Sequence, residues 1–124
     1  MNTDLLIVDD SVAIRKILQR ALRQAQLPIG KVYEAGDGRE ALDVLRNHAV
    51  RLVMTDINMP NMNGLELLAE IRGNDSLREL PVILITTESG HGTVEEAVQM
   101  GASAYIRKPF TPDQIQSKLQ RYFA

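Results

Sequence analysis

The chain has 124 residues, no cysteine and a formal net charge of −2 at pH 7. A single domain of this length can bury a core without metals or disulfides. The lack of cysteine excludes disulfides, thiol nucleophiles and cysteine metal sites, and the charge offers no basic field for nucleic acid or an anionic membrane. No apolar run reaches the length of a transmembrane helix, and the N-terminus lacks the basic segment of a signal peptide, so we expect a soluble cytoplasmic protein.

Short apolar runs alternate with amphipathic stretches along the chain. The runs are Leu5–Val8, Lys31–Ala35, Leu52–Thr55, Val82–Thr86 and Ala104–Arg107. The first, third and fourth are continuously apolar, which is typical of strands buried on both faces of a parallel sheet. The second and fifth are more mixed, which predicts strands at the edges of the sheet.

Apolar residues at helical spacing follow each run. The first helix is expected to carry Ile14 and Ile17 on its apolar face. Asp37 is placed to cap the second helix, and Thr111 begins the fifth with Pro112 in its first turn.

The segment before the fourth helix contains Gly90 and Gly92. Glycine in a helix interior costs about 1 kcal/mol relative to alanine, so we expect this helix to start near Thr93. Its apolar face would include Ala97 and Val98.

Alternating strands and helices predict an α/β fold, a (βα)5 doubly wound parallel five-stranded sheet, in one domain over residues 1–124. Five units are too few for an eight-stranded barrel. Open sheets of this kind place their sites beyond the carboxyl ends of the strands.

Polar residues stand at those ends. Asp9 and Asp10 follow the first strand, Asp56 the third, Thr86 ends the fourth and Lys108 follows the fifth. If the first and third strands are neighbours, two carboxylates about 4 Å apart would repel by about 4 kcal/mol at an effective dielectric near 20, so one is protonated or a cation lies between them. Oxygen ligands without His or Cys suit Mg²⁺, and a carboxylate there is a credible phosphate acceptor.

Five segments at their observed spacing also match a known family. They are LIVDDS at 6–11, EAGDGREAL at 34–42, TDINMPNMNGLELL at 55–68, ITT at 85–87 and GASAYIRKPF at 101–110. Together they resemble the receiver domains of bacterial response regulators, most of all stand-alone chemotaxis regulators of the CheY type. The resemblance, and not the spacing, supplies the flavodoxin-like strand order 2-1-3-4-5, for which the CheY type is itself a reference example.

The resemblance implies a role for each residue at the strand ends. Asp56 would accept a phosphoryl group from a histidine kinase. Asp10 and Asp56 would bind Mg²⁺ directly together with the backbone carbonyl of Asn58, and Asp9 would act through a metal-bound water. Thr86 would contact the phosphoryl group.

The remaining implied roles concern the response to phosphorylation. Lys108 would pair with the phosphoryl group, and its bond to Pro109 is expected to be cis. Tyr105 would be the aromatic switch. Asn58 and Glu88, two residues after Asp56 and Thr86, would tune the lifetime of the phosphoryl group toward a fast reset.

The resemblance also implies partners. They are a histidine kinase, a phosphatase, and a downstream protein target such as the flagellar motor switch, bound through the face of the fourth helix, fifth strand and fifth helix. No nucleic acid or membrane partner is expected. The protein would not be an enzyme beyond phosphorylating itself from small phosphodonors and dephosphorylating itself.

Other functions remain as alternatives. The chain could be a phosphorelay intermediate or a receiver cut from a larger regulator, although its end in the fifth helix favours a single-domain protein. A Mg²⁺-dependent phosphohydrolase of the haloacid dehalogenase type needs an acid two residues after its nucleophile, where Asn58 follows Asp56. A nucleotide-binding module is disfavoured because neither glycine-rich phosphate motif is present.

Overall fold

The computed structural model describes residues 3–86 and 91–123 of the chain. The strands are β1 (Thr3–Val8), β2 (Ile29–Ala35), β3 (Leu52–Asp56), β4 (Val82–Thr86) and β5 (Ala104–Arg107). The helices are α1 (Val12–Gln24), α2 (Gly38–Asn47), α3 (Gly64–Arg72), α4 (His91–Gln99) and α5 (Pro112–Leu119), followed by a short 3₁₀ turn, η1 (Gln120–Phe123). In this described part, none of the helices is long and apolar enough to cross a membrane.

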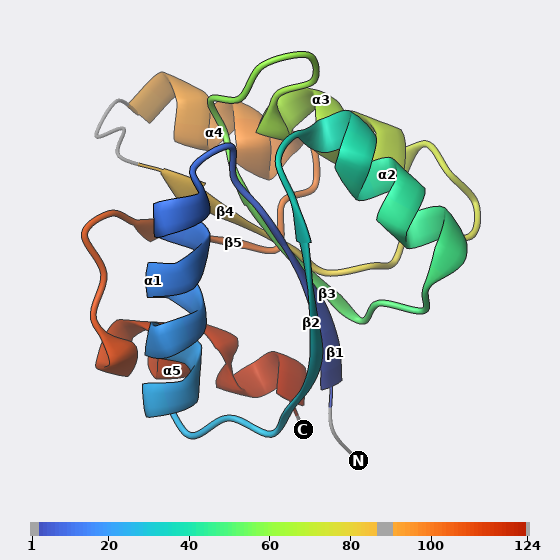
Figure 1. The fold of residues 1–124 in the computed structure, drawn as a ribbon. Helices are drawn as coiled ribbons and strands as arrows, with labels where there is room; N and C mark the ends of the chain where they lie inside the picture. Colours follow the sequence, from blue (N-terminus) through green and yellow to red (C-terminus); the bar gives the residue numbers. More distant parts are fainter. Residues whose placement is uncertain (1–2, 87–90, 124) are drawn as a thin grey trace.

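The strands form one parallel sheet in the order β2-β1-β3-β4-β5, which confirms the expected fold class and strand order. The mixed strands β2 and β5 are the two edges, as their composition predicts. The continuously apolar strands lie between them, where both faces are covered. In Figure 1 the carboxyl ends of the strands point away from the end of the molecule where both termini lie.

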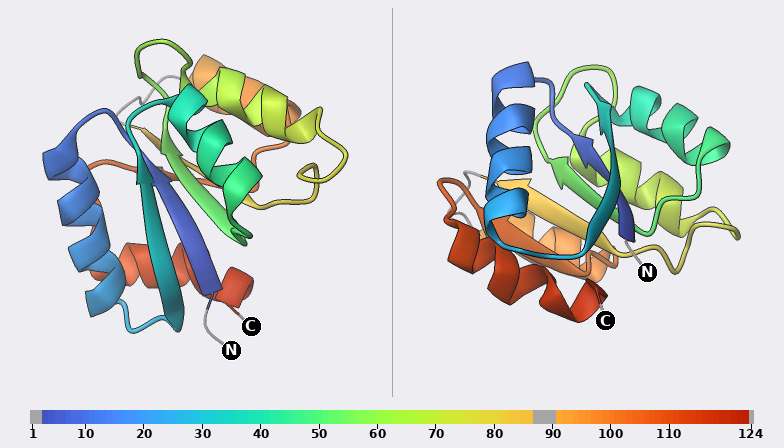
Figure 2. Two further views of the ribbon diagram at one scale, coloured as in Figure 1. Left: turned by 45° about the vertical axis from the view of Figure 1, so that its right-hand side comes forward. Right: turned by 60° about the horizontal axis from the view of Figure 1, so that its bottom comes forward.

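Helices cover both faces of the sheet. Figures 1 and 2 show α1 and α5 on one face and α2, α3 and α4 on the other. Alternate residues of each strand point to opposite faces, and so Leu5 and Ile7 pack toward α1 and α5, whereas Leu6 and Val8 pack toward α2, α3 and α4. The sheet therefore separates two apolar cores, one on each of its faces.

Side-chain caps begin the helices that follow β1, β2, β3 and β5. The capping side chains accept from a backbone N–H three residues later, which satisfies one of the free donors of a helix start. They are Ser11, Asp37, Asn63 and Thr111. The sequence predicts the caps at Asp37 and Thr111, and Pro112 occupies the first turn of α5 as expected.

Three details differ from the sequence-based expectations. Helix α4 begins at His91, two residues before Thr93, so Gly92 is accommodated in its first turn. Ile17 and Val98 were expected on apolar core faces, but their side chains are 53% and 59% exposed. Helical spacing identifies an apolar stripe but not its edges, and both residues lie at an edge. Strand β2 also begins at Ile29, earlier than Lys31.

Candidate functional site

Three carboxylates meet at the carboxyl ends of β1 and β3. The two strands are neighbours, with Val8 paired to Thr55, so the residues that follow them lie side by side. One carboxylate oxygen from each of Asp9, Asp10 and Asp56 lies within 4.8 Å of the others. Asp9 is buried, Asp56 is partly buried and Asp10 is exposed, so the group opens to solvent at one side.

The ammonium group of Lys108 lies against this acidic group. Its Nζ is 3.1 Å from Oδ2 of Asp9 and 3.6 Å from Oδ2 of Asp56. The backbone N–H of Lys108 donates to the Thr86 carbonyl at 2.8 Å, which fixes the chain after β5 beside the end of β4. The Lys108–Pro109 peptide bond is cis, as expected.

Burial raises the pKa of the Asp56 carboxyl above its ordinary range. The nearby Lys108 ammonium opposes this shift, and the carboxylate of Asp9 adds to it. Ionisation of Asp56 is therefore less favourable than ionisation of a free aspartate side chain. This is the electrostatic setting in which a divalent cation is attracted to the site.

Two backbone interactions hold Asp9 in place. The N–H of Ser11 donates to Asp9 Oδ1 at 2.9 Å. Arg15 donates from Nη1 to the Asp9 carbonyl and from Nε to Glu34 at 3.0 Å. Arg15 thereby ties the end of β1 to the end of β2. Arg15 is not among the residues that the sequence predicts for the site, because a charged residue in the first turns of a helix has no distinctive spacing.

The loop between β3 and α3 brings Asn58 to the rim of the site. Asn58 is exposed, and the preceding N–H of Ile57 donates to Asp56 Oδ1 at 2.8 Å. Gly64 closes the loop by donating to the Ile57 carbonyl at 2.8 Å. A Cβ at Gly64 would lie 2.2 Å from the Asp56 carbonyl oxygen, so only glycine allows this close approach.

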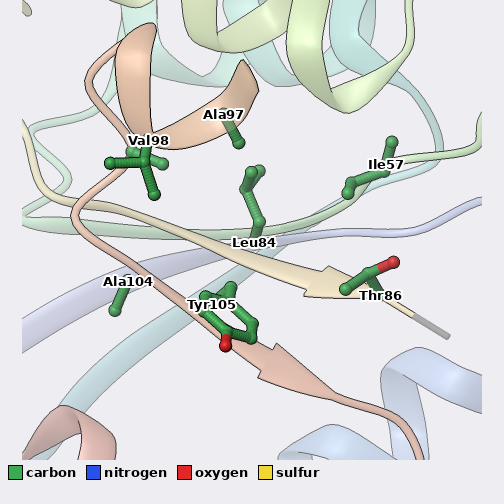
Figure 3. A pocket seen from close by; sticks show the side chains of 8 residues that line it. Ile57, Leu84, Thr86, Ala97, Val98, Ala104 and Tyr105 are labelled. Atoms are coloured by element: carbon green, nitrogen blue, oxygen red, sulfur yellow. The ribbon is translucent and has the colours of Figure 1, made fainter. Parts of the chain in front are cut away.

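Thr86 and Tyr105 border an apolar pocket beside the acidic group. Figure 3 shows both side chains on the neighbouring strands β4 and β5. The pocket is lined by Ile57, Leu84, Thr86, Ala97, Val98, Ala102, Ala104 and Tyr105. Thr86 is buried, whereas Tyr105 is 39% exposed, with the ammonium of Lys118 5.3 Å from its ring centre. The aromatic ring is thus partly exposed while it also lines the pocket.

The structure brings Asp9, Asp10, Asp56 and Lys108 together in one cluster. Asn58 lies in the loop directly after Asp56. Glu88, by contrast, falls outside the described residues, so its expected role stays a prediction.

The chemistry of this donor set fits Mg²⁺. The three carboxylates offer hard oxygen atoms, and no His or Cys joins them among the described residues. Burial, and after it the neighbouring Asp9 carboxylate, raises the pKa of Asp56, and a bound cation would favour the ionised carboxylate. These carboxylates can therefore hold a divalent cation.

Comparisons with known proteins agree with this geometry. The sequence model of the family described as "Response regulator receiver domain" matches residues 5–120. A chemotaxis protein CheY homolog of Campylobacter jejuni is 43% identical over 117 residues, covering 94% of this chain and 88% of that protein. The chemotaxis protein CheY-3 of Vibrio cholerae is 41% identical over 122 residues, covering 98% of this chain and 92% of the relative.

Solved structures show the same fold. The chemotaxis response regulator CheY4 of Vibrio cholerae superposes with a TM-score of 0.87 at 32% identity, covering 98% of this chain and 99% of that one. The BeF3-activated DrrB receiver domain superposes with a TM-score of 0.84 at 28% identity, covering 98% and 97%. The fold, the acidic group at its strand ends and the family match agree, and the chain therefore belongs to the response regulator receiver domain family of two-component systems, with CheY-like chemotaxis regulators among its relatives.

Proposed function

We propose that this protein is a phosphorylation-activated switch in which Asp56 accepts a phosphoryl group from a histidine kinase, with the receiver domain spanning residues 1–124. The observation that carries the proposal is the arrangement of Lys108 against the carboxylates of Asp9 and Asp56. In its ionised form Asp56 has a nucleophilic oxygen, and the adjacent Lys108 ammonium provides positive charge for an incoming dianion.

In the transfer step, a carboxylate oxygen of Asp56 forms a bond to phosphorus while the bond from phosphorus to the donor breaks. The donor's leaving atom keeps the bonding electron pair and takes a proton from solvent. Lys108 leaves its place between the carboxylates to pair with the new phosphoryl oxygens, and the hydroxyl of Thr86 donates to them. No bond within the protein other than the new one to Asp56 is made or broken.

Asp10 and Asp56, with the backbone carbonyl of Asn58, would hold Mg²⁺, and Asp9 would act through a bound water. A bound ion would supply positive charge toward the phosphoryl oxygens. The protein residues orient the acceptor: Ile57 fixes one oxygen of Asp56 through its N–H, leaving the other toward Lys108.

The signal would leave the site through Thr86. As its side chain moves toward the phosphoryl group, space opens in the adjoining pocket, and the partly exposed ring of Tyr105 turns further in. The face of α4, β5 and α5 then changes its preference for a downstream target, such as a flagellar motor switch protein, by a population shift. The protein acts in the cytoplasm in this proposal.

The phosphoryl group would be lost by hydrolysis at a rate set by Asn58 and Glu88, with a phosphatase as a further partner. Purified phosphorylated protein should then lose its phosphoryl group well within an hour. Substitution of Asn58 should change that decay rate. Persistence for hours, unchanged by the substitution, would contradict a fast-resetting switch.

Intact-mass analysis tests the central claim. The protein is incubated with acetyl phosphate and Mg²⁺, with and without a chelator, beside Asp56→Asn. We expect one phosphoryl adduct that requires Mg²⁺ and is absent in the variant. An adduct that persists in Asp56→Asn would place the acceptor elsewhere, and no adduct in the wild type would contradict the proposed function.

A further inference from the structure

The loop between β3 and α3, residues 57–63, has little burial to hold it. Asn58, Pro60 and Asn61 are exposed. Ile57, at the start of the loop, is buried in the core, and the side chains of Met59 and Met62 are partly buried against it. Its base is closed by the Gly64 contact described above. The middle of the loop therefore depends on polar contacts to stay in one place.

Two such contacts join the loop to the start of α2. The side-chain N–H of Asn61 donates to Asp37 Oδ2 at 2.7 Å. The backbone N–H of Gly38 donates to the Met62 carbonyl at 3.0 Å. Asn61 has a φ of 65°, a left-handed conformation that asparagine adopts more readily than most residues. The chain is thus turned so that the Asn61 amide reaches Asp37.

The two oxygens of Asp37 serve two segments. Oδ1 accepts from the N–H of Glu40 at 2.9 Å and caps α2, while Oδ2 accepts from Asn61. Asp37 is only 6% exposed. The hydrogen bond from Asn61, followed by that from Glu40, lowers the pKa of its carboxyl below the ordinary range. The carboxylate is therefore ionised and fully engaged at neutral pH.

Helix α2, which Asp37 caps, is anchored in the core of the domain. Its Ala41 and Leu45 are buried in the core on the α2, α3 and α4 side of the sheet. A loop tied to Asp37 is therefore tied to the rigid body of the domain. Asn58, whose carbonyl is a proposed metal ligand, lies three residues before Asn61 in the same loop.

We infer that Asp37 is a positioning residue for the cation site: through Asn61 it holds the β3–α3 loop so that the Asn58 carbonyl is presented to the ion. Asp37 contacts neither the ion nor the phosphoryl group in this role. The inference rests on the proposed function, which identifies the acidic group as the cation site. It adds Asp37, in the turn between β2 and α2, to the residues that set the affinity of that site for the cation. Losing a supporting partner of a metal ligand typically weakens metal binding by about tenfold or more.

Asp37→Ser separates this role from helix capping. Serine is as good an N-cap as aspartate, so it keeps the bond from Glu40, but its single short hydroxyl cannot also reach Asn61. Asn61→Gly removes the tether from the other side and keeps the positive φ. Asp37→Asn is the conservative variant, because its amide can cap α2 through oxygen and donate to a turned Asn61 amide.

Asp43→Ser is the matched charge control. Asp43 lies on the same helix, its side chain is 70% exposed, and its carboxylate pairs with Arg46. The Asp43→Ser substitution removes one negative charge from the same helix and leaves the Asp37–Asn61 contact in place. A long-range charge effect would appear in Asp43→Ser and Asp37→Asn, whereas a tether effect would not.

Mg²⁺ affinity is measured on the unphosphorylated protein by calorimetric titration, with thermal unfolding as a check of folding. We expect about tenfold weaker binding in Asp37→Ser and in Asn61→Gly, and no further loss beyond about twofold in the double variant, because both remove one contact. Asp37→Asn and Asp43→Ser should stay within about twofold of wild type. The Mg²⁺ concentration for half-maximal phosphorylation by acetyl phosphate should rise in parallel, with the rate at saturating Mg²⁺ changed less.

Wild-type Mg²⁺ affinity in folded Asp37→Ser would overturn the inference, as would losses that multiply in the double variant. If Asp37→Ser does not fold, Asn61→Gly in the exposed loop decides the question alone. A wild-type protein that binds Mg²⁺ but takes no phosphoryl group would contradict the proposed function while leaving the tether intact. The two failures are therefore distinguishable.

Discussion

Lys108 and Asp9 are 99 residues apart in the chain, yet Nζ of the first lies 3.1 Å from Oδ2 of the second. Their side chains are 15% and 6% exposed, so this ion pair is largely withdrawn from water. It joins the loop after the edge strand β5 to the end of β1. A pair at this depth matters most when one partner is removed, because the other charge remains buried.

Lys108→Met should lower the free energy of unfolding of the metal-free protein by about 3 kcal/mol. The physical reason is that the buried Asp9 and partly buried Asp56 lose their nearest cation. Saturating Mg²⁺ should recover part of the loss, since it restores positive charge at the same carboxylates. Urea unfolding with and without Mg²⁺ measures both effects.

Lys16→Met is the control for that substitution. Lys16 is also a lysine paired with a carboxylate, Glu34, but its side chain is 65% exposed. An exposed pair contributes about 0–1 kcal/mol. An equal loss in the two variants would show that burial of the Lys108 pair is unimportant.

Asp56→Asn should stabilise the metal-free protein at neutral pH. Burial raises the pKa of Asp56 in the folded state, so the folded protein binds this proton more tightly than the unfolded chain does. Ionisation of Asp56 therefore costs stability above its folded pKa, and the cost disappears as the pH falls below the unfolded value of about 3.9. The gain from Asp56→Asn should follow the same pH course.

Urea unfolding of both proteins from pH 3.5 to 8 checks this sign. The stability curves should separate as the pH rises, with the variant above the wild type. Mg²⁺ at pH 7 should raise the stability of the wild type more than that of Asp56→Asn. Curves that run parallel over the whole range would contradict the raised pKa.

Gly64→Ala should damage both the stability and the chemistry of the site. A Cβ there would meet the Asp56 carbonyl oxygen at 2.2 Å and Ile57 Cα at 2.9 Å, and these are backbone atoms that cannot turn aside as a side chain can. We expect a loss of stability of about 2 kcal/mol or more and slower phosphorylation by acetyl phosphate, because the end of β3 must shift.

Gly36→Ala serves for comparison. Its nearest contact would be the Glu40 carboxylate at 3.2 Å, the far end of an exposed side chain. That side chain can turn aside, so phosphorylation should remain near wild type. Matching losses in the two variants would indicate a general intolerance of alanine rather than the close approach at Gly64.

Arg72→Met should loosen the support of the α4–β5–α5 face. The guanidinium of Arg72 donates to the Gly101 carbonyl at 3.0 and 2.8 Å and to the Leu80 carbonyl at 2.7 Å. It thus joins the end of α3 to the segments that enter β4 and β5. Burial lowers the pKa of the Arg72 guanidinium, and the nearby Glu79 opposes this shift.

The expected loss for Arg72→Met is about 2–3 kcal/mol, with faster hydrogen exchange at amides between α4 and β5. Arg72→Lys should recover little, since an ammonium cannot reach the same carbonyls in a planar fork. Arg46→Met, which removes an exposed pair with Asp43, should change stability by less than about 0.5 kcal/mol. Unchanged exchange in Arg72→Met would show that this contact does not hold the segment.

Much of the fold and part of the site can be predicted from the sequence. The runs within β1, β3 and β4 are almost entirely apolar because both faces of a central parallel strand are covered, and a run of apolar residues can be recognised locally in the chain. The doubly wound class follows from the alternation of strands and helices. This fold class places the carboxyl ends of the strands at one edge of the sheet. In the structure, the residues that follow those ends lie together there: Asp9, Asp10, Asp56 and Lys108.

Other features were decided only by tertiary structure. Ile17 and Val98 fit helical apolar stripes, but the packing of the elements leaves both of them exposed. The sequence predicts Asp37 as a helix cap. The hydrogen bond from Asn61 to the second carboxylate oxygen of Asp37 forms only because two turns meet in space. A contact between distant segments leaves no periodicity in either one. The sequence by itself therefore determined which residues are buried in strands and which stand at their ends, and only packing decided which of the side chains touch.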